Sequence, residues 1–227
     1  MAIAGMEKVA VSHKLKRARL YGILDMGYVQ KDTMQQVAGQ LLQGGVEVLQ
    51  LRAKGYDGAG VLALLREWAP DLGEMCRSYG VPLIVNDFAE VAVALAADGV
   101  HIGQDDGSLA AVRAVVGEEM IVGRSTHSPE QAMAAVDEGF DYIGFGPLFP
   151  TPTKQGRPGI GLENIPLVER EVAGRIPVFC IGGIVPENLE LVLASGARRV
   201  VIVSALLKAA DITAAVQSAL IKLKTKH

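Results

Sequence analysis

Residues 82–103 read PLIVNDFAEVAVALAADGVHIG, and this stretch decides the fold. Its two ends, residues 82–87 and 99–103, are short and largely apolar, which is typical of strands buried on both faces of a parallel sheet. Residues 89–97, which lie between them, predict a helix. The stretch therefore predicts a strand–helix–strand unit, and polar residues follow the apolar part of its first strand.

The same unit repeats along the chain. Strands are predicted over residues 19–25, 46–52, 82–87, 99–103, 120–126, 142–147, 177–183 and 199–205. Helices are predicted over residues 33–43, 59–79, 89–97, 109–117, 129–138, 163–173, 186–194 and 212–224. Strict alternation of this kind favours a closed (β/α)8 barrel. The alternative is an open doubly wound sheet, but a strong G-x-G-x-x-G motif after the first strand is absent.

We therefore expect a protein of the α/β class, a single (β/α)8 TIM barrel over residues 19–227 with a short, partly helical N-terminal extension over residues 1–18. The extension carries Lys14, Lys16 and Arg17, which predict a solvated helix. No apolar signal-peptide stretch follows these residues, and no run approaches the roughly 20 apolar residues of a membrane span. The sequence thus predicts no membrane partner.

Composition narrows the kinds of partner. The chain has 227 residues, of which 50% are hydrophobic, enough for one sizeable core. Its net charge of −3 provides no global basic field for nucleic acid, so any anion site must be built locally. The two cysteines, Cys76 and Cys180, fit no metal-binding spacing. We expect both to be buried and inert, in a protein of the reducing cytoplasm.

Polar residues gather where predicted strands end, the position at which barrel enzymes place their catalytic groups. The second strand offers Gln50 and Arg52 on one face, and Lys54 follows them. Arginine and lysine suit phosphate oxygens, although a salt-bridged barrel rim would need the same residues.

Carboxylates follow the next two strands. Asn86 and Asp87 end one of them, and Asp106 follows the other. One aspartate from each strand end would suit a hard divalent cation such as Mg²⁺, which prefers oxygen ligands and often takes substrate phosphate as well. The alternative is that Asp87 or Asp106 caps the helix that follows it.

Hydroxyls and one further cation follow the fifth and sixth strands. Ser125 is expected to donate to a phosphate oxygen, whereas His127 fits a structural role as well as a catalytic one. His101 lies inside a strand and is expected to belong to the core. Thr151, Thr153 and Lys154 could close over an anion, or they could form an ordinary surface loop.

Small residues end the last two strands. Gly182, Gly183, Val203 and Ser204 stand where barrels often bind phosphate with backbone N–H groups, although the glycines also fit a tight turn. Two phosphate regions are therefore predicted, one cationic and assisted by metal, the other a neutral cup of backbone amides.

Seven motifs together resemble the thiamine-phosphate synthase family. The resemblance runs from about residue 19 to residue 207. In chain order, the motifs are QLRAK (50–54), IVND (84–87), GQDD (103–106), GRSTH (123–127), GPLFPTPTK (146–154), CIGGI (180–184) and VIVSA (201–205). Each is weak alone, and the set in this order is highly specific.

The resemblance implies that two small-molecule substrates, a hydroxymethylpyrimidine diphosphate and a thiazole phosphate, are joined with release of pyrophosphate through a pyrimidine cation. It implies that Mg²⁺ is bound by Asp87 and Asp106. The residues implied in substrate binding are Gln50, Arg52, Lys54, Asn86, Ser125 and Lys154 for the diphosphate, and Thr151, Thr153, Gly183, Val203 and Ser204 for the thiazole phosphate. Among these, the catalytic residues implied are Arg52, Lys54, Ser125 and Lys154.

Other functions remain open at this point. A thiazole tautomerase-like paralogue would use His127 for acid–base work. A regulatory barrel would bind a thiazole phosphate without catalysis, and a phosphosugar isomerase would explain Gly182 and Gly183 but not two phosphate regions. The complete set of cationic, acidic and hydroxyl residues favours the synthase. The sequence also leaves open whether the chain forms a homo-oligomer.

Overall fold

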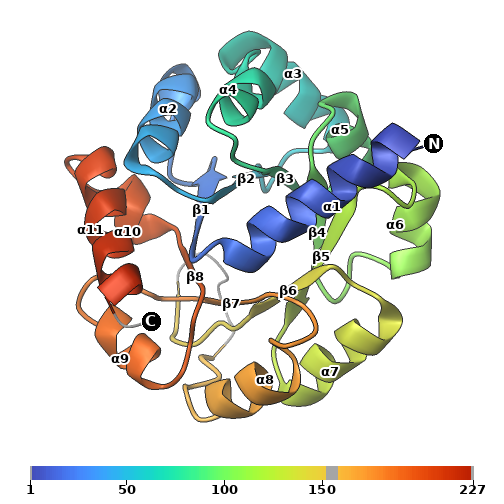
Figure 1. The fold of residues 1–227 in the computed structure, drawn as a ribbon. Coiled ribbons are helices and arrows are strands. Elements are labelled where there is room, and N and C mark those ends of the chain that lie inside the picture. Colours follow the sequence, from blue (N-terminus) through green and yellow to red (C-terminus); the bar gives the residue numbers. More distant parts are fainter. Residues whose placement is uncertain (1, 152–157, 226–227) are drawn as a thin grey trace.

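Eight parallel strands close into a barrel in the order β1 to β8, as the computed structural model shows (Figure 1). It describes residues 2–151 and 158–225. The strands are β1 Leu20–Asp25, β2 Val48–Arg52, β3 Leu83–Asn86, β4 Gly99–Ile102, β5 Ile121–Thr126, β6 Tyr142–Phe145, β7 Val178–Ile181 and β8 Val200–Ile202. This architecture confirms the predicted TIM barrel and excludes the open sheet.

Helices form the outer ring around the strands (Figure 1). They are α2 Met34–Gly44, α3 Gly58–Trp68, α4 Leu72–Ser78, α5 Ala89–Ala94, α6 Leu109–Val116, α7 Pro129–Glu138, α8 Ile165–Glu171, α9 Leu189–Ala194, α10 Ser204–Leu207 and α11 Ile212–Thr225, with a 3-10 turn at Lys31–Thr33. None of the helices in the described residues is long and apolar enough to cross a membrane.

Local sequence signals explain several helix ends. The Ser128 side chain accepts a hydrogen bond from the Gln131 amide, and Pro129 begins α7. Gly45 and Gly139 end α2 and α7 with φ of 99° and 94°, a left-handed conformation that costs glycine little.

One predicted helix is wrong in its extent. Residues 59–79 form two helices, α3 and α4, instead of one. The break lies at Ala69, whose φ of −151° is outside the helical region. Pro70 follows it, and a proline disfavours helical backbone in the residue before it. The short helix α10 was also not predicted.

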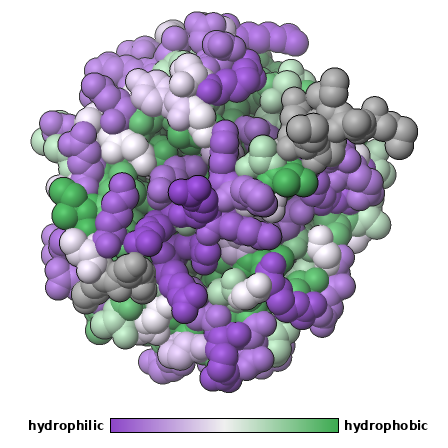
Figure 2. Space-filling model, viewed as in Figure 1, coloured by the Kyte–Doolittle hydropathy of each residue, from purple (hydrophilic) through white to green (hydrophobic). Residues whose placement is uncertain are grey.

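The N-terminal helix α1, Ala2–Arg17, lies across the end of the barrel where the strands begin (Figure 1). Leu15 and Ala18 are buried there against residues of the barrel interior, such as Ile121. Lys14, Lys16 and Arg17 are exposed, as expected, and Figure 2 shows that this face is mostly hydrophilic. The extension therefore closes one end of the barrel, and the pocket must open at the other.

Two hydrophobic cores result from the alternation of side chains along each strand. The larger packs the helices onto the outside of the barrel, and the smaller fills the barrel itself. Both cysteines are buried and free. Burial raises the pKa of the Cys76 thiol to about 12 and also raises that of Cys180, so both stay protonated and inert at neutral pH.

Three aromatic rings fill the middle of the barrel. Phe179 meets Tyr21 and Tyr142 edge to face, with ring centroids 5.3 and 5.9 Å away. The Tyr142 ring fits because residue 123 is glycine: a Cβ on Gly123 would lie 2.2 Å from the Tyr142 ring.

We predict that Gly123→Ala lowers the free energy of unfolding by about 1–3 kcal/mol, because overpacking forces Tyr142 out of place. Gly174→Ala is the matched control, since a Cβ there would meet no atom within 4 Å. Denaturant unfolding measures both variants. Equal stability of Gly123→Ala and Gly174→Ala would show that the barrel interior accommodates the added methyl group without loss of stability.

Candidate active site

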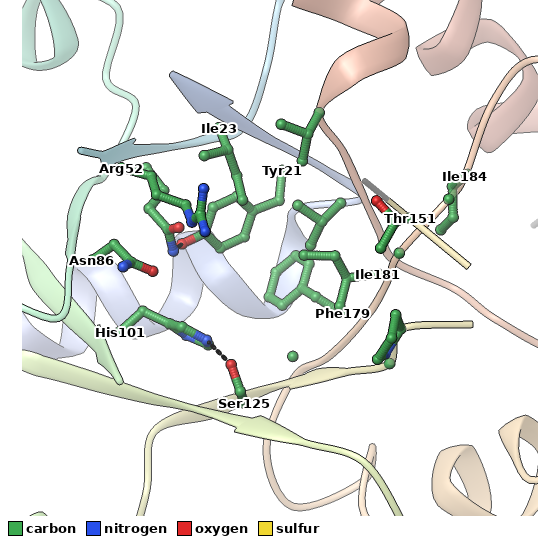
Figure 3. A pocket seen from close by; sticks show the side chains of 18 of the residues that line it. Tyr21, Ile23, Arg52, Asn86, His101, Ser125, Thr151, Phe179, Ile181 and Ile184 are labelled. Atoms are coloured by element: carbon green, nitrogen blue, oxygen red, sulfur yellow. Dashed lines mark hydrogen bonds between the residues drawn. The ribbon is translucent and has the colours of Figure 1, made fainter. Parts of the chain in front are cut away.

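A pocket opens at the carboxyl ends of the strands, and side chains or backbone of all eight strands line it. Figure 3 shows polar Arg52, Asn86, His101 and Ser125 on one part of its wall, and apolar Phe179 and Ile181 on another. Of the predicted site residues, those that line the pocket are Gln50, Arg52, Asn86, Ser125, Thr151, Gly183, Val203 and Ser204.

The remaining predicted residues do not line this pocket or are not described. Lys54, Asp87 and Asp106 are exposed at the loops that follow β2, β3 and β4. Thr153 and Lys154 lie outside the described residues. The pocket thus brings together Arg52 and uncharged polar groups. Asp87 and Asp106 lie instead on the loops that follow β3 and β4.

Arg52 is held by a buried ion pair. Its Nη1 donates to Asp25 Oδ2 at 2.6 Å, and Asp25 is 1% exposed. The two residues are direct neighbours in the β1–β2 register. The second carboxylate oxygen of Asp25 accepts from the Gly27 amide at 2.9 Å, so both oxygens have a partner. Asp25 therefore fixes the direction in which Arg52 presents its positive charge.

The two predicted metal ligands follow neighbouring strands, since β3 pairs with β4. Asp87 has a φ of 66°, which is uncommon for any residue except glycine and turns the chain sharply after β3. Asp106 Oδ2 accepts from the Gly103 amide at 2.7 Å. Neither residue caps a helix: Ser108 caps α6, and α5 has no side-chain cap. The capping alternative is therefore wrong.

The loop that carries Asp106 is tied to β5. Arg124 Nη1 donates to the Gly107 carbonyl at 2.8 Å, and Gln104 Nε2 donates to the Ser125 carbonyl at 2.6 Å. The Arg124 guanidinium also lies 5.3 Å from the centre of the Phe140 ring. These contacts hold the loop of residues 103–107, which carries Asp106, beside the strand that carries Ser125.

A chain of hydrogen bonds crosses the barrel at the floor of the pocket. Gln50 Nε2 donates to Tyr21 Oη at 2.9 Å, and Tyr21 Oη lies 3.2 Å from Tyr142 Oη. Tyr142 Oη lies 3.1 Å from His101 Nδ1, and His101 Nε2 lies 3.0 Å from Ser125 Oγ. His101 is 9% exposed but lines the pocket, so it is part of the site wall as well as of the core.

The opposite wall is built from tightly packed backbone. Gly182 and Gly183 have φ of 102° and 65°, and a Cβ on either would come within 3 Å of residues 147–149. The Asn188 side chain holds this turn: it donates to the Gly183 carbonyl at 2.9 Å and accepts from the Val185 amide at 2.8 Å. Glycine is therefore needed at both positions for conformation and for space.

His127 contacts the loop that leads to Thr151. Its Nδ1 donates to the Gly146 carbonyl, and its amide donates to the Gln131 side chain at 2.8 Å. A carbonyl only accepts, so the Nδ1 of His127 carries a hydrogen. This contact gives His127 a structural function at the edge of the pocket.

Sequence reasoning missed Asp25, Tyr21 and Tyr142 as parts of the site. Asp25 could have been found, because an inward arginine needs a polar partner and Asp25 ends the neighbouring strand. Nothing in the sequence indicates that the two tyrosines, from β1 and β6, meet across the barrel.

A pocket with polar and apolar walls at the carboxyl ends of a closed parallel barrel is typical of a (β/α)8-barrel enzyme. The model of the family described as thiamine monophosphate synthase matches residues 20–206. A thiamine-phosphate synthase from Acidothermus cellulolyticus is 44% identical over 198 residues, which cover 87% of this chain and 91% of that relative. One from Thermus thermophilus is 46% identical over 170 residues, 75% of this chain and 79% of the relative.

A solved structure agrees with these relatives. Thiamine phosphate pyrophosphorylase from Pyrococcus furiosus has a TM-score of 0.81 and 29% identity, with 95% of this chain and 98% of that chain covered. The chain belongs to the thiamine monophosphate synthase family and is a transferase.

We predict that Asp25→Ala lowers the free energy of unfolding by about 3–5 kcal/mol, because it leaves the Arg52 charge buried without its partner. The control is Glu74→Ala, which breaks an exposed pair with Arg77 and should cost less than about 1 kcal/mol. Chemical denaturation gives both values. A cost for Asp25→Ala no larger than the control would mean that water replaces the lost carboxylate.

Proposed function

We propose that this enzyme joins 4-amino-2-methyl-5-hydroxymethylpyrimidine diphosphate to 4-methyl-5-(2-phosphoethyl)thiazole, giving thiamine phosphate and pyrophosphate. The observation that carries the proposal is the pocket itself. Arg52, Asn86 and Ser125 line one part of it, while Gly183 and Ser204 line the part built from glycine-rich backbone. One pocket with two such regions suits two substrates that each carry phosphate.

In the proposed reaction, the bond between the pyrimidine methylene carbon and the diphosphate oxygen breaks first. Its electron pair leaves with pyrophosphate, and the resulting pyrimidine cation is captured by the lone pair of the thiazole nitrogen. No covalent bond to the protein forms. The pocket contributes by holding both partners together and by excluding water from the cation.

Charge on the leaving group is the main barrier that the residues must lower. Arg52, Lys54 and Lys154 are proposed to place positive charge on the pyrophosphate, and Ser125 to donate a hydrogen bond to it. Fixed cations and donors stabilise developing charge more than water does, because they are already oriented. Gln50 and Asn86 are proposed to bind the pyrimidine diphosphate.

The thiazole phosphate is assigned to the other region. Gly183 and Ser204, with Val203, are proposed to offer backbone N–H groups to it, and Thr151 and Thr153 to donate from their hydroxyls. The left-handed turn at Gly183 supports this assignment, since it allows a ligand to approach the backbone closely.

Mg²⁺ is part of the proposal, with Asp87 and Asp106 as its ligands. The two carboxylates follow paired strands, are exposed, and offer the hard oxygen atoms that this ion prefers. Mg²⁺ is commonly held by one or two carboxylates together with substrate phosphate, which fits two aspartates and a diphosphate substrate. When bound, the ion would neutralise charge on the diphosphate.

The direct test mixes the purified protein with both substrates and Mg²⁺ and measures pyrophosphate and thiamine phosphate together. Equal amounts of both products are expected, and EDTA should abolish both. If neither product forms while the thiazole phosphate still binds, the protein is a tautomerase-like or regulatory paralogue instead, and His127 becomes the residue to mutate.

We predict that Asp87→Asn and Asp106→Asn each lower kcat at limiting Mg²⁺ by at least about tenfold, because each removes a charged ligand. Asparagine tolerates the left-handed backbone of Asp87 and can still accept from the Gly103 amide at position 106, so local structure is kept. Steady-state assays over a range of Mg²⁺ concentrations measure the effect.

The matched control is Asp71→Asn, an exposed carboxylate at the start of α4 that makes no capping hydrogen bond. Its Mg²⁺ dependence should equal that of the unaltered protein. If Asp87→Asn and Asp106→Asn also match the unaltered protein, the metal assignment fails, although the synthase activity could still stand.

A further inference from the structure

The hydrogen bonds that cross the barrel can be assigned a single direction. The Gln50 amide nitrogen can only donate, so Tyr21 Oη accepts from it at 2.9 Å. Tyr21 Oη lies 3.2 Å from Tyr142 Oη, and either oxygen could be the donor. We assign the donor to Tyr21, because the opposite direction would leave the Tyr21 hydrogen with no acceptor among these groups. With that assignment, the hydrogen of Tyr142 is available to His101 Nδ1, which lies 3.1 Å from Tyr142 Oη. Each phenol thus accepts from one side and donates to the other.

The direction fixes the tautomer of His101 and the orientation of Ser125. Because Nδ1 accepts from Tyr142, the neutral ring carries its hydrogen on Nε2. That hydrogen is donated to Ser125 Oγ at 3.0 Å, the contact drawn in Figure 3. The hydroxyl hydrogen of Ser125 then cannot point at His101, and it is left to donate to a pocket ligand.

We propose that His101 and Tyr142 are positioning residues, which hold Ser125 Oγ as an acceptor and thereby aim its hydrogen at an anionic oxygen of the substrate. The inference rests on the proposed function for its substrate, the pyrimidine diphosphate. Neither residue needs to touch the reacting atoms.

The surrounding structure preserves this chain of hydrogen bonds. Burial raises the pKa of Tyr21 and of Tyr142, so both phenols keep their hydrogens at neutral pH. Gly123 makes the room for the Tyr142 ring, because a Cβ there would lie 2.2 Å from it.

A purely structural function is the alternative, since a buried phenol needs a hydrogen bond in any case. The two explanations differ in what happens when Ser125 is absent. If Tyr142 acts through Ser125, its hydroxyl should matter only while Ser125 is present. A double-mutant cycle separates these cases.

We predict that Ser125→Ala lowers kcat by about 100- to 1000-fold, as loss of one oriented donor does elsewhere. Tyr142→Phe should lower kcat by about tenfold, with a smaller change in KM. In the Ser125→Ala background, Tyr142→Phe should change kcat less than about twofold. A tenfold loss in both backgrounds would overturn the proposal.

Thr126→Val is the matched control for a lost buried hydroxyl. Thr126 follows Ser125 on β5, is fully buried, and donates to the Gly144 carbonyl at 3.1 Å without lining the pocket. Its kcat should stay within about twofold of the unaltered protein. A loss as large as that of Tyr142→Phe would mean that removal of any buried hydroxyl near the pocket has this effect, and the proposal would fall.

A second measurement needs no activity. Nitrogen NMR of the histidine rings in the ligand-free protein, assigned with His101→Gln, should place the His101 hydrogen on Nε2, and Tyr142→Phe should weaken that preference. A hydrogen on Nδ1 would overturn the positioning role even in an active synthase. Absence of product in the direct assay, with the hydrogen on Nε2, would instead overturn the proposed function alone.

Discussion

The aromatic layer inside the barrel is the constraint on which the site depends. Phe179 fills the centre, and Tyr21 and Tyr142 pack against its edges with their hydroxyls fully buried. A buried hydroxyl is costly unless it is hydrogen-bonded. The two phenols bond to each other and, at either end, to Gln50 and His101. The same side chains therefore pack the barrel core and form the floor of the pocket.

The pocket has two walls of different kinds on either side of this floor. On one side, the Asp25–Arg52 pair keeps a positive charge at the pocket although the guanidinium is almost buried. On the other, Gly182 and Gly183 form a turn that no larger residue could adopt without displacing its neighbours. A fixed cation and an open backbone are different ways to receive phosphate, and the barrel places them across one cavity.

The sequence predicts the barrel well because strand and helix periodicity are local properties. It also predicts which strand ends carry polar groups, so Gln50 and Ser125 were placed correctly at the pocket. It cannot show contacts across the barrel, such as that between Tyr21 and Tyr142, which depend on closure of the sheet. The helix break at Ala69 was missed although Pro70 signals it, because the apolar pattern continues on both sides.

The most direct measurement is a crystal structure of the protein with pyrophosphate and Mg²⁺. Our account predicts pyrophosphate oxygens within about 3 Å of Ser125 Oγ and of the Arg52 guanidinium. The opposite end of the barrel offers a competing cationic groove, which includes Lys16, Arg17 and Arg199. Pyrophosphate bound there, with the pocket at the carboxyl ends of the strands left empty, would contradict the account.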